Sequence, residues 1–169
     1  MKISIKDTSI KGVKIINYNN FKDKRGTIWT TYLKDYFDKH NLYNFKHDKF
    51  SVSNKDVIRG IHYDSYTAKL VTAVYGSIQQ VVVDMRVDSP TYKQYLSFDI
   101  NENNRYSILI PPMVGNGFRV KSESAVYHYK LSYDGKYQDD TNQYTLKWDD
   151  PSVGIKWNCN YPNLSDRDS

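Results

Sequence analysis

The sequence is poor in the residues that cross-link or divide a chain. Cys159 is the only cysteine among its 169 residues, and there are five prolines and eight glycines. A lone cysteine excludes a disulfide framework and a zinc site built from cysteines. No stretch rich in proline, glycine and serine marks a linker, so we expect one domain over residues 1–169 around one hydrophobic core.

Long hydrophobic runs are also missing. No segment reaches the length of a membrane span, and the opening residues MKISIKDTSIKG lack the apolar core of a signal peptide. We therefore expect a cytoplasmic protein without membrane contact.

Basic residues outnumber acidic residues by 24 to 19, which gives a formal net charge of +5. The lysines and arginines are dispersed among acidic residues, and no basic run interleaved with aromatic residues marks a nucleic-acid surface. We therefore expect no nucleic-acid partner. A small anion such as a nucleotide diphosphate accounts for the positive charge equally well.

Tyrosine is abundant, with sixteen residues. Tyrosine favours strands, and in a pocket it can stack on a ring and donate a hydrogen bond. Short strand patterns separated by turn-forming residues predict an antiparallel sandwich or barrel. We expect these strands near residues 2–5, 12–18, 26–33, 50–53, 56–63, 69–76, 77–86, 95–100, 106–112, 117–122 and 124–133. One helix is predicted within residues 30–43, with Leu33 and Phe37 on a shared face, and the chain after residue 157 is predicted to be ordered coil.

The segment VIRGIHYDSYTAKLV, residues 57–71, places three basic side chains in apolar strand patterns. His62 is either a core histidine or a metal ligand, and Lys69 is either an edge-strand lysine or a cation that stabilises an oxyanion. Arg59 is either a surface charge or a phosphate ligand. In an ideal strand Arg59 and His62 would point to opposite faces, because side chains alternate. Gly60 lies between them and could host a bulge that turns both toward one pocket.

Motifs along almost the whole chain resemble those of the cupin-fold nucleotide-sugar 3,5-epimerases, the family of dTDP-4-keto-6-deoxyglucose 3,5-epimerase. The similar segments, in order, are FKDKRG (F-x-D-x-R-G in the family), VIRGIHY (LRGLHF or LRGLHY), GSIQQVVVDMR (GEVFDVAVDLR), LIPPMVGNGF (the IP-x-GFAHGF region), AVYHYK and LSDRD (LS-x-KD). The resemblance implies an all-β cupin jelly-roll barrel with a few short helices. It also implies a homodimer that exchanges N-terminal strands, and an isomerase that needs no cofactor.

The resemblance assigns catalytic roles to four residues. His62 matches the general base and Asp168 its carboxylate partner, while Tyr129 matches the acid on the opposite face of the sugar. Lys69 matches the lysine beside the keto oxygen. A ketone at carbon 4 acidifies the hydrogens at carbons 3 and 5, so such a site needs a base, an opposed acid and donors at the oxygen.

The resemblance also assigns substrate-binding roles, with some departures from the family. Arg25 and Arg59 match the arginines that hold the pyrophosphate. Asn116 stands where the family's AHGF has its histidine, and His47 and Lys49 replace polar residues of the family's QDNHS segment.

No metal site is predicted. A metal-binding cupin would carry a second histidine two positions after His62, where this chain has Asp64. The other three histidines show no ligand spacing with His62.

The departures bear on the substrate. Together with Thr30, where the family has a glutamate near the nucleotide, they favour a GDP-linked 6-deoxy-4-keto-heptose of capsular polysaccharide biosynthesis. FKHDKFS and KLVTAVYG are most similar to epimerases of that branch. We expect inversion at carbon 3, or at carbons 3 and 5. Three alternatives stay open: the same reaction on a dTDP-4-keto-6-deoxyhexose, a 3,4-ketoisomerase, and a non-catalytic nucleotide-sugar-binding cupin.

Overall fold

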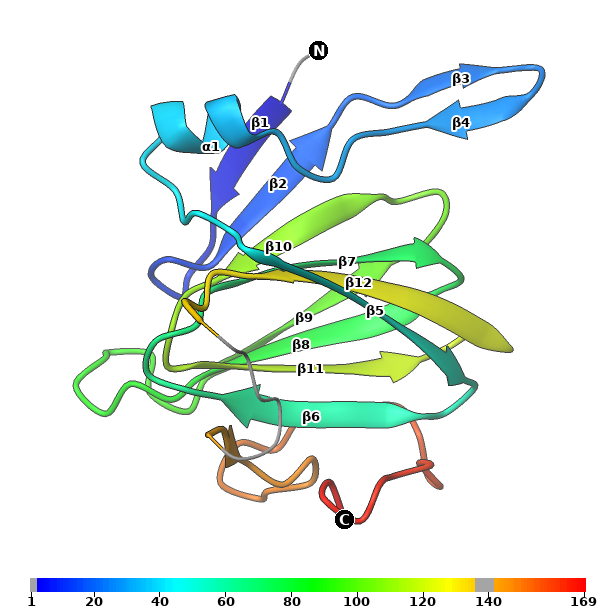
Figure 1. Cartoon of the computed structure of the whole chain (residues 1–169). Helices are drawn as coiled ribbons and strands as arrows, with labels where there is room; N and C mark the ends of the chain where they lie inside the picture. The colour runs from blue at the N-terminus through cyan, green and yellow to red at the C-terminus, as the bar shows by residue number, and fades with distance from the viewer. Residues whose placement is uncertain (1–2, 136–141) are drawn as a thin grey trace.

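The computed structural model describes residues 3–135 and 142–169, and strands dominate it (Figure 1). The strands are β1 Ile3–Asp7, β2 Lys14–Tyr18, β3 Phe21–Asp23, β4 Gly26–Ile28, β5 His47–Asn54, β6 Ile58–Tyr63, β7 Lys69–Tyr75, β8 Ile78–Asp84, β9 Tyr95–Ile100, β10 Tyr106–Ile110, β11 Val114–Val120, β12 Ser124–Leu131 and β13 Tyr144–Thr145. The helix α1 spans Lys34–Lys39. Within the described residues no helix is long and apolar enough to cross a membrane.

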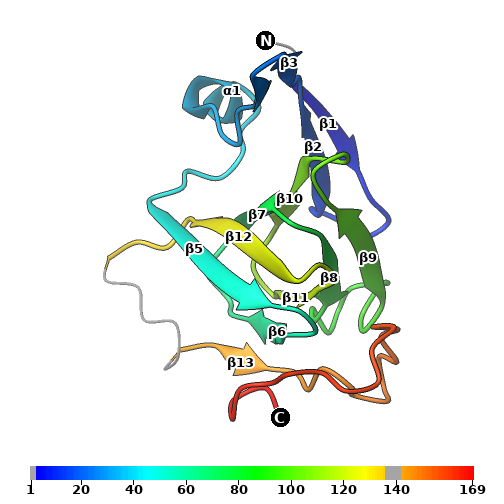
Figure 2. The same cartoon turned by 90° about the vertical axis from the view of Figure 1, so that its right-hand side faces the viewer.

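Two antiparallel sheets face each other (Figure 2). The first has six strands in the order β1-β2-β10-β7-β12-β5, and the second has five in the order β13-β6-β11-β8-β9. Strands β3 and β4 form a separate hairpin that projects away from the sheets (Figure 1). The main core lies between the sheets, where apolar side chains of β7, β8, β10, β11 and β12 pack together. This double sheet confirms the predicted all-β jelly-roll class.

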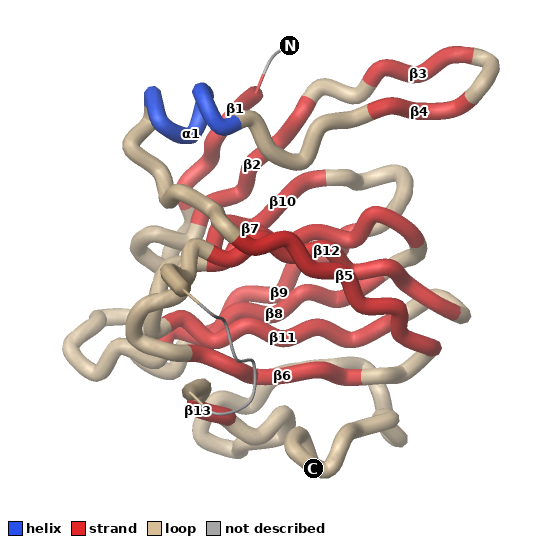
Figure 3. The backbone as a smooth tube through the Cα atoms, viewed as in Figure 1, coloured by secondary structure: helices blue, strands red, loops and turns tan. Residues whose placement is uncertain are grey.

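After β12, residues 142–169 cover the outer face of the five-stranded sheet, and apart from β13 they are loop (Figure 3). Leu146, Ile155 and Trp157 of this segment pack against Val81 and Val83 of β8, which is buried along its whole length. A strand buried on both faces is expected to be continuously apolar, as VVV of β8 is. The expected coil after residue 157 is confirmed, and it runs beside the start of β6, where the backbone N–H of Ile58 donates to the oxygen of Asn163 at 3.1 Å.

Helix α1 is shorter than the predicted segment. It begins after Leu33, whose backbone is extended and whose side chain is 40% exposed, so the predicted shared face with Phe37 is wrong. Phe37 alone of that pair is buried, against Ile16 and Leu70 on the outer face of the six-stranded sheet. The short strands β3 and β13 were not among the predicted strands.

A bulge in β6 turns two side chains toward one side. Asn116 of β11 pairs with His62, while Phe118 pairs with Arg59, so three steps along β6 match two steps along β11. Gly60 lies inside this bulge with φ +117°, a conformation that favours glycine. The bulge predicted at Gly60 is confirmed, and it removes the alternation that would separate Arg59 from His62.

We expect Gly60→Ala to destabilise the protein by at least about 2 kcal/mol, because of backbone strain and close contacts. A Cβ at Gly60 would lie 2.5 Å from the Asn116 oxygen and 2.6 Å from the Gly117 Cα. The control is Gly154→Ala, at φ +66° with no atom within 4 Å of the added Cβ. Gly154→Ala should lower the stability by about 1 kcal/mol, the cost of the positive φ without any close contact. Urea unfolding measures both, and equal losses would contradict the bulge as described.

Candidate active site

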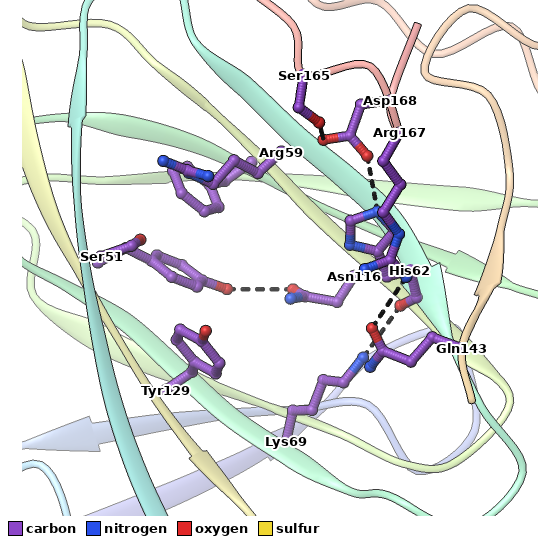
Figure 4. Close-up of a pocket in the computed structure, with 12 residues that line it drawn as sticks. Ser51, Arg59, His62, Lys69, Asn116, Tyr129, Gln143, Ser165, Arg167 and Asp168 are labelled. Carbon is purple, nitrogen blue, oxygen red and sulfur yellow. Dashed lines mark hydrogen bonds and ion pairs between the residues drawn. The ribbon is translucent and has the colours of Figure 1, made fainter. Parts of the chain in front are cut away.

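A pocket of about 230 Å³ opens between the two sheets (Figure 4). Strands β5, β6, β7, β11 and β12 supply most of its lining, and the segment after β12 supplies the rest. The lining residues are Ser51, Arg59, His62, Lys69, Asn116, Phe118, Tyr127, Tyr129, Gln143, Ser165, Arg167 and Asp168. The structure therefore brings together His62, Lys69, Tyr129, Asp168, Arg59 and Asn116, six of the nine predicted site residues.

The imidazole of His62 is held by a buried carboxylate. Nε2 of His62 lies 2.7 Å from Oδ1 of Asp168, and the hydroxyl of Ser165 donates to Oδ2 of Asp168 at 3.0 Å. Burial raises the pKa of Asp168, but the hydrogen bonds from His62 and Ser165 outweigh it and hold that pKa below its ordinary value. Asp168 is therefore a carboxylate at neutral pH, able to orient the imidazole and stabilise its protonated form.

Lys69 is a buried cation at one end of the pocket. Its side chain is enclosed, and Nζ donates to the backbone oxygen of His62 at 3.0 Å. Burial lowers the pKa of Lys69 to about 8; Asp64 opposes this shift and the charge of Arg167 adds to it. The amine is still mostly protonated at neutral pH, in a low-dielectric place where a positive charge acts strongly on developing negative charge.

Tyr129 lies on the other side of the pocket from His62 (Figure 4). It comes from β12 of the six-stranded sheet, whereas His62 comes from β6 of the five-stranded sheet. Burial raises the pKa of Tyr129, and the positive charge of Arg59 opposes the shift. Its hydroxyl therefore keeps its proton at neutral pH and can donate it. This arrangement places a candidate base and a candidate acid on opposite walls.

The two predicted phosphate-binding arginines lie in different places. Arg59 lines the pocket, and its Nε donates to the hydroxyl of Ser53 at 2.9 Å. Arg25 lies in the exposed turn between β3 and β4, where its Nη2 contacts Oδ2 of Asp23 at 2.6 Å. It does not line this pocket of its own chain.

His47 and Lys49 do not line the pocket either. They lie on β5 next to it: Nε2 of His47 is 3.1 Å from the backbone oxygen of Tyr133, and Nζ of Lys49 is 5.8 Å from the centre of the Tyr129 ring. Their predicted substrate-binding roles stay predictions.

Several lining residues were not predicted from the sequence. Ser165 and Arg167 precede Asp168 in the LSDRD motif, so that motif could have indicated them. Ser51 and Gln143 gave no signal, because strand patterns show which face a side chain occupies but not which distant segment it meets. Among the described residues, no group of three histidine, cysteine, aspartate or glutamate side chains could hold a metal ion.

Comparisons with known proteins show which family the chain is similar to. The family model described as dTDP-4-dehydrorhamnose 3,5-epimerase matches residues 7–169. An enzyme of that name from Salmonella typhimurium is 31% identical over 175 residues, covering 100% of this chain and 93% of the enzyme. A second enzyme of that name, from Neisseria gonorrhoeae, is 35% identical over 92% of this chain. The matched part spans about half (47%) of that relative's own length.

A solved structure gives the same result. The Legionella pneumophila dTDP-6-deoxy-D-glucose-3,5-epimerase, in complex with dTDP-4-keto-L-rhamnose, superposes with a TM-score of 0.89 at 31% identity. The match covers 99% of this chain and 90% of that one. The likeness therefore extends over both sheets and the segment that follows them.

Proposed function

Because the chain belongs to the dTDP-4-dehydrorhamnose 3,5-epimerase family, a family of isomerases, we propose that it epimerises a nucleotide-linked 4-keto-6-deoxy sugar. One observation carries the proposal: the His62 imidazole, 2.7 Å from the Asp168 carboxylate, faces Tyr129 across the pocket. A base and an acid on opposite walls are what inversion of a carbon centre requires.

The proposed reaction moves protons and nothing else. Because Asp168 occupies Nε2 of His62, Nδ1 is the ring nitrogen that takes the proton from the carbon next to the ketone. The electron pair of the broken C–H bond passes to the keto oxygen as an enolate, which the Lys69 ammonium stabilises. Tyr129 then delivers a proton to the opposite face of the carbon, and solvent restores both groups to their starting states.

The comparisons favour a dTDP-linked 4-keto-6-deoxyhexose as the substrate, since the family and the relatives above have dTDP sugars in their names. The GDP-linked heptose expected from the sequence has no support among them and is the second candidate. Three departures from the family's motifs favour it: Asn116 in the pocket, and His47 and Lys49 beside it. In either case the proposed role of Arg59, which lines the pocket, is to bind a diphosphate oxygen.

A homodimer would complete the phosphate site. Arg25 lies on a hairpin that projects from the barrel, and the cross-strand pair Phe21 and Ile28 on that hairpin is 62% and 69% exposed. Exposed apolar residues of this kind on a projecting hairpin are suited to an interface. In the predicted dimer the hairpin would pack on the partner and bring Arg25 toward the partner's pocket.

The reaction is tested by incubating the protein in D2O with dTDP-4-keto-6-deoxyglucose and with a GDP-6-deoxy-4-keto-heptose. We expect NMR to show deuterium at carbon 3, or at carbons 3 and 5, of the dTDP sugar. His62→Asn should lower this exchange by roughly 100- to 10,000-fold, the usual worth of general acid–base catalysis.

Other outcomes decide among the alternatives. Exchange confined to the GDP sugar would replace the first candidate by the second, and a carbonyl moved to carbon 3 would indicate a ketoisomerase. If the sugars bind but no carbon-bound hydrogen of either sugar exchanges with deuterium, catalysis is refuted.

Tyr129→Phe should separate exchange from inversion. His62 can still remove the proton and return a solvent deuteron to the same face, whereas the opposite face has lost its donor. The variant should therefore incorporate deuterium yet form little inverted product, as measured by NMR of the sugar ring protons. Full inversion in Tyr129→Phe would give the acid role to another group, and complete loss of exchange would place Tyr129 in the first step.

Sedimentation velocity tests the dimer. We expect the protein to sediment as a dimer at micromolar concentration, and Phe21→Asp with Ile28→Asp to shift it toward monomer. A wild-type monomer under these conditions would contradict the predicted assembly.

A further inference from the structure

A buried amide lies directly beneath the pocket wall. Gln80 of β8 is completely buried, and its Nε2 lies 2.7 Å from Oδ1 of Asn116. The same Nε2 lies 3.0 Å from the backbone oxygens of Val81 and Gly117. Because these are acceptors, the orientation of the Gln80 amide is fixed with its nitrogen toward Asn116.

This fixed orientation determines the orientation of Asn116. Its Oδ1 accepts from Gln80 and lies 3.1 Å from the hydroxyl of Tyr127, which itself donates to Oε1 of Gln80 at 2.8 Å. Both contacts of Asn116 with this network therefore end on Oδ1. The other end of the amide, Nδ2 with its two N–H groups, takes part in neither contact, and Asn116 lines the pocket.

We propose that Gln80 is a positioning residue that holds Asn116 as a neutral hydrogen-bond donor to an uncharged oxygen of the sugar. This rests on the proposed function, since it assumes that a sugar occupies the pocket. The recognised group is a hydroxyl or keto oxygen, because an amide N–H is suited to an oxygen acceptor and carries no charge.

Two departures from the family's motifs meet in this contact. In GSIQQVVVDMR, Gln80 stands where the motif GEVFDVAVDLR has aspartate, and Asn116 stands where AHGF has histidine. The two positions are 36 residues apart in sequence and join in one hydrogen bond. An aspartate and a histidine both titrate, whereas the pair in this chain is neutral at every pH. Among the described residues that line the pocket, His62 is therefore the only one with an imidazole.

The neighbouring Gln79 provides a matched control. It is on the same strand, is 8% exposed, and its Nε2 donates to Ser97 and to the backbone oxygen of Lys156, on the far side of the sheet from the pocket. Gln80→Met and Gln79→Met each remove one buried amide of the same size. Any general loss of stability should therefore appear in both variants.

We expect Gln80→Met to raise the KM for the nucleotide sugar roughly fivefold, the worth of one neutral hydrogen bond. The rate of deuterium exchange at saturation should change less, since His62 and Asp168 are untouched. Gln79→Met should leave KM within about twofold, below the worth of such a bond. Equal KM values for the two variants would overturn the proposal.

A second variant tests the neutrality of the pair. Gln80→Asp combined with Asn116→His introduces the motif's residues, and we expect the pH profile of kcat/KM to gain an ionisation that the wild type lacks. An unchanged profile would mean that the pair does not face the reacting sugar, which overturns the proposal.

NMR of the Asn116 side-chain amide separates failure of this proposal from failure of the reaction. We expect its Nδ2 resonances to move when dTDP-4-keto-6-deoxyglucose is added to the wild type, and to move less in Gln80→Met. Turnover without such a shift would overturn the positioning role and leave the reaction standing. A shift without any turnover would support the positioning role and refute the reaction.

Discussion

The bond between the Asp168 carboxylate and the His62 imidazole depends on three separate features of the fold. It joins residues 106 positions apart in the sequence. The bulge at Gly60 turns His62 into the pocket, and the segment after β12 docks on the five-stranded sheet and so brings Asp168 beside β6. Ser165 then holds the second carboxylate oxygen. If any one of these were lost, the imidazole would lose its orientation.

Positive charge is concentrated around this bond. Lys69, Arg59 and Arg167 all line the pocket, and burial brings the pKa of Lys69 down to about 8. Keeping the Lys69 cation buried costs folding stability. Such a cost is common at sites that stabilise charge appearing only during a reaction. The amide of Asn116 can contribute a directional hydrogen bond to this pocket without adding further charge.

The sequence predicted much of the fold because its signals are local. Apolar strand patterns and turn residues located β6, β7 and β8. The alternation of side chains along a strand indicated that Arg59 and His62 could share a pocket only if Gly60 hosts a bulge. The short helix was harder to place, since Leu33 and Phe37 fit a helical face although only Phe37 finds a partner. The contact between Gln80 and Asn116 could not be predicted from pattern, because it depends on the register between β8 and β11. Asp168 was placed in the site only by resemblance to the family.

The part of the covering segment that follows β13, residues 147–169, is held differently from the strands. It is attached by apolar side chains such as Trp157 and by single hydrogen bonds from Arg119 and Ile58, rather than by a continuous ladder. Segments of this kind form cooperative units that open at lower free energy than the sheets beneath them. Because Asp168 lies on this unit, its opening would remove the carboxylate from His62 while both sheets stay folded. Loss of activity on mild heating would then precede melting of the barrel, and would reverse when the segment docks again.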